Sequence, residues 1–160
     1  PAYDHHYYQA LRFFVAGRRA TALDHWQRFY QSAPRTPWRF VIQGRVDEMR
    51  QRAFTARDLE VTLGKVEQSV ALKAVNGVAK RLRACLGTLP ARATVADYRG
   101  VRLTFQLKAG RLLNIAVTRK VGAVPTTAPA CLQTALRRLP WRRLAPGRDA
   151  AQLHVEVVGP

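Results

Sequence analysis

Residues 100–120 read GVRLTFQLKAGRLLNIAVTRK, and the alternation in this stretch decides the fold. Apolar side chains occupy every second position from 101 to 107 and alternate with polar ones, which is the period of a half-buried strand. Gly110 supplies the positive φ that a tight reversal needs, and Leu113, Ile115 and Val117 resume the alternation. We therefore predict a β-hairpin whose apolar face needs a cover, because a lone two-stranded hairpin is marginal in water.

The segments on either side of the hairpin show the apolar period of helices. Their apolar stripes consist of Val70, Ala74, Val78, Leu82 and Cys85, and of Cys131, Leu132, Ala135, Leu136 and Leu139. A closing stretch alternates again through Leu153, Val155 and Val157. The order helix, strand, strand, helix, strand predicts an α+β domain with two helices on one face of a three-stranded antiparallel sheet. Residues 59–63 also alternate, which favours a short strand that this order does not include.

The first part of the chain has a different pattern, with three amphipathic helical segments between residues 3 and 49. We place a domain boundary after residue 57, which gives a helical segment at 1–57 and the α+β domain at 58–160. The helical segment resembles one tetratricopeptide repeat plus the first helix of another. The resemblance depends on the spacing of Phe13, Gly17, Ala22, Trp26, Pro34 and Trp38.

The repeat spacing predicts that Trp26 and Trp38 pack at the seam between successive helices. An independent solenoid needs about three repeats, so either more repeats precede the segment or its helices pack on the rest of the chain. Two roles stay open, a groove for a peptide or protein partner and a helical spacer or cap.

The charge of the chain is strongly basic. The 160 residues carry a formal net charge of +17, and 22 of the 27 basic residues are Arg. Such a balance indicates contact with polyanions, namely nucleic acid, anionic lipid or acidic protein. The alternative is that Arg reflects a GC-rich genome and that these side chains are solvated faces, since no nucleic-acid recognition motif accompanies them.

The residue types that commonly catalyse reactions are not arranged in a recognisable catalytic motif. No close pair of carboxylates, phosphate-binding glycine loop or nucleophilic Ser motif is present, and no carboxylate or Cys completes a metal set around His5 and His6. We predict a protein that is not an enzyme and that has no metal, no cofactor and no small-molecule substrate. Cys85 and Cys131 fit no zinc spacing, and composition alone leaves open whether they form a disulfide or two buried thiols.

The α+β part resembles the TonB C-terminal-like modules of bacterial envelope proteins, most closely the AgmX/PglI C-terminal type. The resemblance covers about residues 70–158. Its ordered features are Cys85 at the end of a helix, the run from Gly100 to Phe105, Gly110 in the hairpin, Cys131 opening the next helix, Trp141 after that helix, and the closing apolar strand.

The resemblance implies a non-enzymatic scaffold module in the periplasm that binds protein partners, often by adding a strand to a sheet edge. It also implies a membrane anchor in an N-terminal segment that this sequence lacks. One Cys in each of the two places implies a Cys85–Cys131 disulfide, formed outside the reducing cytosol.

A basic cluster is the candidate contact site for a partner or an anionic polymer. It consists of Arg137, Arg138, Trp141, Arg142 and Arg143. In a nucleic-acid- or polyanion-binding protein, the alternative function, Trp141 would stack on a base while the arginines bind phosphates. In the other interpretation, Trp141 fills the edge of the core and the arginines face water.

Overall fold

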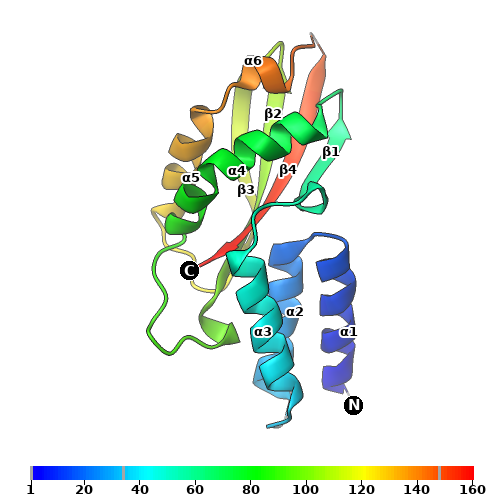
Figure 1. Ribbon diagram of the computed structural model, residues 1–160, viewed down its shortest axis with the longest axis vertical. Helices are drawn as coiled ribbons and strands as arrows, with labels where there is room; N and C mark the ends of the chain where they lie inside the picture. Colours follow the sequence, from blue (N-terminus) through cyan, green and yellow to red (C-terminus); the bar gives the residue numbers. More distant parts are fainter. Residues whose placement is uncertain (1, 34, 148) are drawn as a thin grey trace.

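The computed structural model describes residues 2–33, 35–147 and 149–160, so that Pro34 of the repeat-like spacing lies outside the described residues. In these residues the chain is an α+β protein, with helices on both faces of one antiparallel sheet (Figure 1). The helices are α1 (Ala2–Val15), α2 (Arg19–Ser32), α3 (Trp38–Gln51), α4 (Gln68–Ala84), α5 (Ala128–Arg137) and α6 (Trp141–Leu144). The strands are β1 (Leu59–Leu63), β2 (Arg99–Lys108), β3 (Arg111–Val121) and β4 (Ala150–Gly159).

The predicted hairpin is confirmed as the antiparallel pair β2–β3. Ala109 joins Gly110 at positive φ, 49° and 69°, and two such residues are what a two-residue hairpin turn with the twist of its strands requires. The expected place of Leu113 on the buried face is wrong. Gln106 pairs with Asn114 and Leu107 with Leu112, so a β-bulge leaves Leu113 unpaired and 61% exposed.

The expected sheet of three strands is also wrong, because the described residues form four, in the order β1-β4-β2-β3. The stretch at 59–63 is a strand and pairs antiparallel with β4, with Leu59 opposite Val155. Without β1, one edge of β4 would present unpaired backbone N–H and C=O groups, and β1 pairs part of that edge. Therefore β1 and β3 are the two edge strands.

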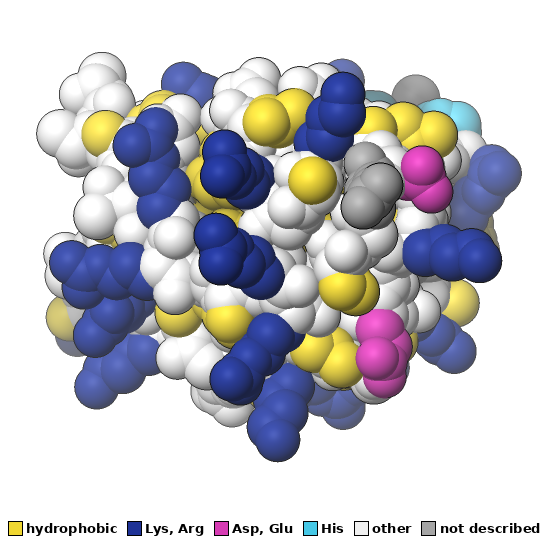
Figure 2. Space-filling model, turned by 90° about the horizontal axis from the view of Figure 1, so that it is seen from above, with side chains coloured by type: hydrophobic (Ala, Val, Ile, Leu, Met, Phe, Trp, Pro, Cys, Tyr) yellow, Lys and Arg dark blue, Asp and Glu magenta, His cyan; other side chains and the backbone are white. Residues whose placement is uncertain are grey.

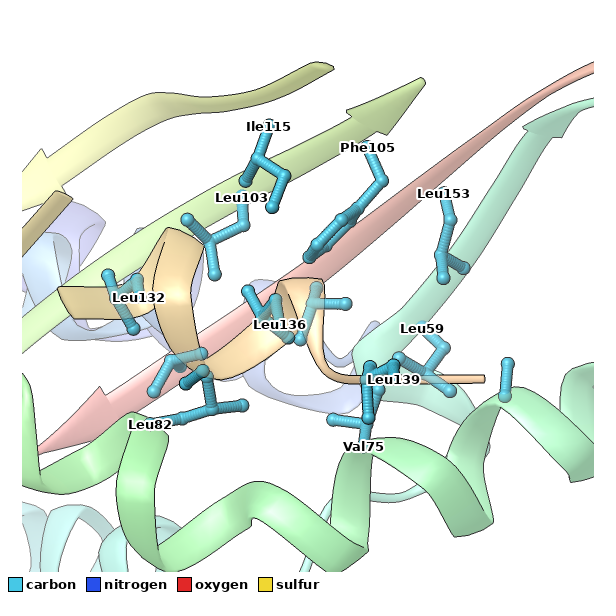
Figure 3. Packing of buried hydrophobic residues seen from close by; sticks show 14 of the residues in the cluster. Leu59, Val75, Leu82, Leu103, Phe105, Ile115, Leu132, Leu136, Leu139 and Leu153 are labelled. Carbon is cyan, nitrogen blue, oxygen red and sulfur yellow. The ribbon is translucent and has the colours of Figure 1, made fainter. Parts of the chain in front are cut away.

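The main core lies between the sheet and the helices α4, α5 and α6 (Figure 3). The predicted alternation is confirmed on β2 and β4, whose inward side chains are buried. Of the predicted helical stripe, Leu82 and Cys85 are buried as expected. Earlier in α4 the buried residues are Ala71, Val75 and Ala79, one position further along than the predicted Val70, Ala74 and Val78, which are half-buried.

The disulfide between Cys85 and Cys131 is present, with Cα atoms 5.6 Å apart. Cys85 follows the last residue of α4, and Cys131 lies in the first turn of α5. The end of one helix therefore meets the start of the next, as the family resemblance implies.

The opposite face of the sheet is covered at one end by α2 and α3, with α1 packed outside on α2 (Figure 1). Gly100 of β2 makes this possible, because a Cβ there would lie 3.1 Å from the Cα of Ala20 on α2. A second apolar cluster joins these helices to Val95, Tyr98, Val121 and Val158 of the α+β part. The helices thus pack on the rest of the chain, while the boundary after residue 57 stays a prediction.

The two tryptophans of the repeat-like segment differ. Trp26 is fully buried and its ring lies 5.5 Å from that of Phe14 on α1, as predicted for a seam between helices. For Trp38 the prediction is wrong in part: its ring lies 5.6 Å from that of Tyr7, yet 55% of the residue is exposed.

Candidate functional site

The predicted contact cluster separates into one buried residue and four exposed ones. Trp141 opens α6 and is only 6% exposed; its ring lies 5.5 Å from that of Phe105, and its indole N–H donates to the carbonyl of Leu136 at 3.0 Å. Trp141 therefore fills the edge of the core and offers no face for a base. Arg137, Arg138, Arg142 and Arg143 are all exposed.

Three of these arginines line a groove of about 850 Å³ between the start of β3 and the segment that contains the end of α5 and α6. Arg137, Arg142 and Arg143 form one side, and Arg111 of β3, which the sequence analysis missed, joins them. Arg138 lies elsewhere, in a hollow beside the disulfide that it lines together with Arg81. The structure thus brings together four arginines from two segments that are far apart in the sequence.

The charge of this groove is uncompensated. Its described lining residues include the four arginines and no carboxylate, and none of the four forms an ion pair within the described part of the chain. Figure 2, which looks down on this end of the molecule, shows Lys and Arg side chains spread over it. A surface of this kind attracts anionic groups, and guanidinium groups bind carboxylate or phosphate in a bidentate manner.

The edge of β3 forms the other side of the groove. The carbonyl of Ile115 accepts a hydrogen bond from the Gln133 side chain of α5 at 3.2 Å, so this carbonyl points away from β2 and toward the groove side of the strand. At the bulge, Leu113 presents an exposed apolar side chain next to it. The repeated leucines at 112 and 113 break the alternation, and this was the signal in the sequence that a bulge was present.

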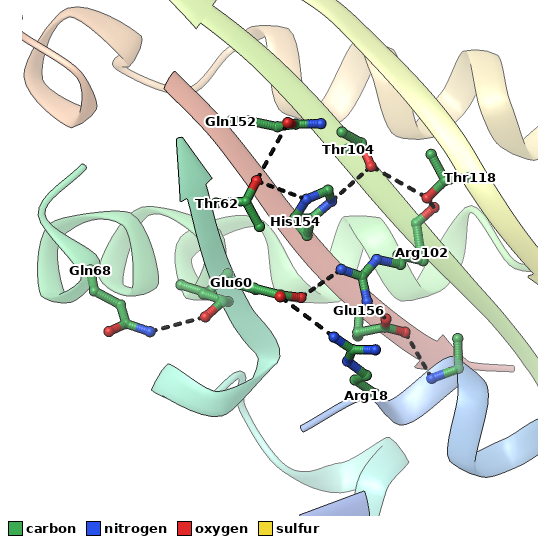
Figure 4. A network of polar contacts seen from close by, with 12 residues as sticks. Arg18, Glu60, Thr62, Gln68, Arg102, Thr104, Thr118, Gln152, His154 and Glu156 are labelled. Carbon is green, nitrogen blue, oxygen red and sulfur yellow. Dashed lines mark hydrogen bonds and ion pairs between the residues drawn. The ribbon is translucent and has the colours of Figure 1, made fainter. Parts of the chain in front are cut away.

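A second polar region lies on the sheet face that α4 and α5 leave uncovered (Figure 4). Arg102 donates to Glu60 at 2.6 Å and to Glu156 at 3.2 Å, and Arg18 approaches Glu60 at 3.5 Å. His154 uses both ring nitrogens, toward Thr104 at 2.8 Å and Thr62 at 3.2 Å. The charged groups and His154 line a hollow of about 460 Å³ beside the loop between α1 and α2.

The electrostatics of this region follow from burial. Burial raises the pKa of Glu156, which is 3% exposed, although the backbone N–H of Ala20 and Arg102 donate to its carboxylate. The hydrogen bond from Arg102 lowers the pKa of Glu60, and burial lowers the pKa of His154. Since each of these groups is held by neighbours and Glu156 binds the first turn of α2, the network ties the helices to the sheet.

The described residues contain no cluster of metal ligands and no membrane-spanning helix. His6 and His25 meet across α1 and α2 with their Nδ1 atoms 3.2 Å apart, but no group of three or more His, Cys, Asp or Glu residues is suited to hold a metal ion. None of the described helices combines the length and apolar character that a bilayer crossing requires.

Comparisons with known proteins give no match: no family model matches the chain, and neither a curated protein nor a solved structure matches it. The resemblance to TonB C-terminal-like modules and the absence of enzymatic activity therefore stay predictions.

Proposed function

We propose that this protein is a non-enzymatic scaffold module of a bacterial cell-envelope assembly and that it binds protein partners in the periplasm. The observation that carries the proposal is the groove along β3. It combines the outer edge of β3, which pairs with no further strand in the described residues although Gln133 occupies its Ile115 carbonyl, with the exposed Leu113 and four uncompensated arginines. An extended partner segment with acidic side chains fits this combination, since it adds a strand to β3 and pairs its carboxylates with the arginines.

Two further features support the assignment to the cell envelope. A disulfide persists in an oxidising compartment such as the periplasm, and Cys85 and Cys131 form one. The family resemblance of residues 70–158 favours the same compartment. The helices α1 to α3 we assign as a tetratricopeptide-like spacer or cap, because α1 and α2 pack together through Trp26 and α2 in turn packs on the sheet.

A titration with a synthetic peptide of alternating Val and Glu tests the groove, with a Val-Lys peptide as the control ligand. We expect the Val-Glu peptide to shift the backbone amide NMR signals of residues 111–117. Charge reversal at Arg142 and Arg143 to Glu is expected to weaken its binding by about tenfold or more, because two charge-assisted contacts become repulsive.

The matched control is Lys73→Glu with Lys80→Glu, two exposed residues of α4 that do not line the groove and change the net charge by the same amount. We expect this variant to bind the Val-Glu peptide nearly as tightly as the wild type. Equal loss in both variants, or amide shifts elsewhere on the surface, would contradict the proposed site.

The second candidate function is binding of nucleic acid or another polyanion, favoured by the four exposed arginines and the net charge of +17. The burial of Trp141 removes the base-stacking contact on which this function depended. A steep loss of affinity for single-stranded DNA with rising salt, starting from tight binding at physiological salt, would favour it over the peptide-binding proposal.

A further inference from the structure

The start of α3 lies at the end of the molecule opposite to α6 (Figure 1). It exposes an unusual set of apolar side chains. Phe40 is 83% exposed, Trp38 55% and Val41 45%, and Pro37 just before the helix is exposed as well. Exposed apolar residues that stand singly are ordinary, but four within five consecutive positions mark a contact surface.

This exposure follows from how α3 packs. Its buried stripe is Ile42, Val46 and Met49, so the side chains of the first turn lie beyond the core. Trp38 contacts Tyr7 of α1 with its ring and leaves more than half of its surface in solvent. We call Pro37, Trp38, Phe40 and Val41 the α3 tip.

The surroundings of the α3 tip are basic. Between Asp24 and Asp47 the sequence contains four arginines and no carboxylate. Arg35 is exposed beside the tip, and Arg39 lies with its guanidinium carbon 4.2 Å from the centre of the Tyr30 ring. Arg35, Arg39, Phe40 and Tyr30 line a common hollow of about 460 Å³. Aromatic side chains with adjacent arginines are the composition of surfaces that enter the headgroup region of a membrane.

We propose that the α3 tip binds the surface of an anionic lipid bilayer. Trp38, Phe40 and Val41 enter the boundary between headgroups and acyl chains, and the exposed Arg35 binds lipid phosphates. A second copy of the chain fits less well, since two chains of charge +17 repel each other. A single nucleic-acid strand would use the aromatic rings, but it offers nothing apolar to Val41 and Pro37.

The chain carries its own probe for this contact. Of its three tryptophans, Trp26 is fully buried and Trp141 is 6% exposed, whereas Trp38 is largely in solvent. A change in tryptophan emission on addition of vesicles, with the fold unchanged by circular dichroism, therefore reports on Trp38.

The experiment compares vesicles of phosphatidylcholine with vesicles of phosphatidylcholine and phosphatidylglycerol. With the anionic vesicles we expect a blue shift of the emission and protection from the aqueous quencher acrylamide, and with the neutral vesicles neither. Phe40→Ser with Val41→Ser should weaken partitioning by about tenfold or more, because it removes the apolar area that enters the lipid.

Two variants serve as controls. Leu113→Ser, at the opposite end of the molecule, also removes an exposed apolar side chain and should leave partitioning unchanged. The variant with Arg142 and Arg143 changed to Glu should still show the blue shift, which separates this inference from the proposed peptide groove.

Four outcomes would overturn the inference. They are an unchanged Trp38 emission with anionic vesicles, full binding by Phe40→Ser with Val41→Ser, a blue shift that grows with protein concentration in the absence of lipid, and an equal shift with single-stranded DNA. Full binding by the double Ser variant indicates adsorption by charge alone. A blue shift without lipid indicates self-association, and an equal shift with single-stranded DNA indicates nucleic-acid binding.

Discussion

The two faces of the sheet are covered by helices in different ways. On one face α4, α5 and α6 enclose a continuous apolar core. The Cys85–Cys131 disulfide links the end of α4 to the first turn of α5. On the other face a smaller apolar cluster beneath α2 and α3 is supplemented by polar contacts between buried groups. Apolar contacts tolerate small shifts in register, whereas polar ones require particular groups to face each other.

Three sets of polar contacts hold α2 on the second face. The side-chain amide of Gln27 donates to the carbonyls of Val95 and Tyr98, at 3.2 and 2.9 Å. Arg19 pairs with Asp58 at 2.6 Å where both side chains are nearly inaccessible. Glu156 of β4 accepts a hydrogen bond from the backbone of α2. These contacts fix the position of the helices on the sheet, and losing one partner leaves a buried polar group unpaired.

The largest expected effect comes from the apolar part of the second face. Trp26→Ala should lower the free energy of unfolding by about 3–5 kcal/mol, because the side chain is fully buried. Urea denaturation measures it. Trp38→Ala is the matched control and should cost clearly less than Trp26→Ala, because more than half of Trp38 is already in solvent. Equal costs at the two positions would show that Trp38 belongs to the core.

The next effect concerns the first face. Cys85→Ala with Cys131→Ser should lower the free energy of unfolding by about 4 kcal/mol, the chain-entropy value for a loop of this length. Reductant should lower the stability of the wild type to that of the variant and leave the variant unchanged. If reductant has no effect on the wild type, the two thiols are not bonded in the protein.

The smallest effect tests the polar contacts by pH. Burial raises the pKa of Glu156 above its unfolded value, so the folded protein holds a proton that the unfolded chain releases. Relative to Glu156→Gln, the wild type should therefore lose stability as pH rises through the raised pKa, and the difference should vanish at lower pH. Urea denaturation at a series of pH values measures it.

Glu60→Gln is the control of opposite sign for this pH series. The hydrogen bond from Arg102 lowers the pKa of Glu60, so its contribution is present above the unfolded pKa and is lost as pH falls through the folded one. Its effect should be modest, since Glu60 is 41% exposed. If both variants show the same sign, Glu156 is not desolvated in the way the structure shows.

Most residues of the candidate site could be predicted from the sequence, but their arrangement in space could not. The basic cluster at 137–143 was visible as a charge pattern, and the burial of Trp141 was one of two interpretations. Arg111 was missed because it lies more than twenty residues away, and only the packing of α5 and α6 against β3 brings it to the groove. The polar hollow around Arg102 and Glu156 was missed because each residue alternates on its strand like an ordinary solvent-facing one.

The sequence by itself determined the hairpin at 100–120, the α+β class and the helices around the hairpin, because periods of 2 and 3.6 residues are local properties of the chain. The tertiary structure alone decided that β1 joins β4, that α2 packs against Gly100, and that Trp26 is buried while Trp38 is exposed. These outcomes depend on which surfaces meet across long separations in the sequence. An amphipathic pattern indicates which face of a helix or strand is buried. Only the tertiary packing decides which element covers that face.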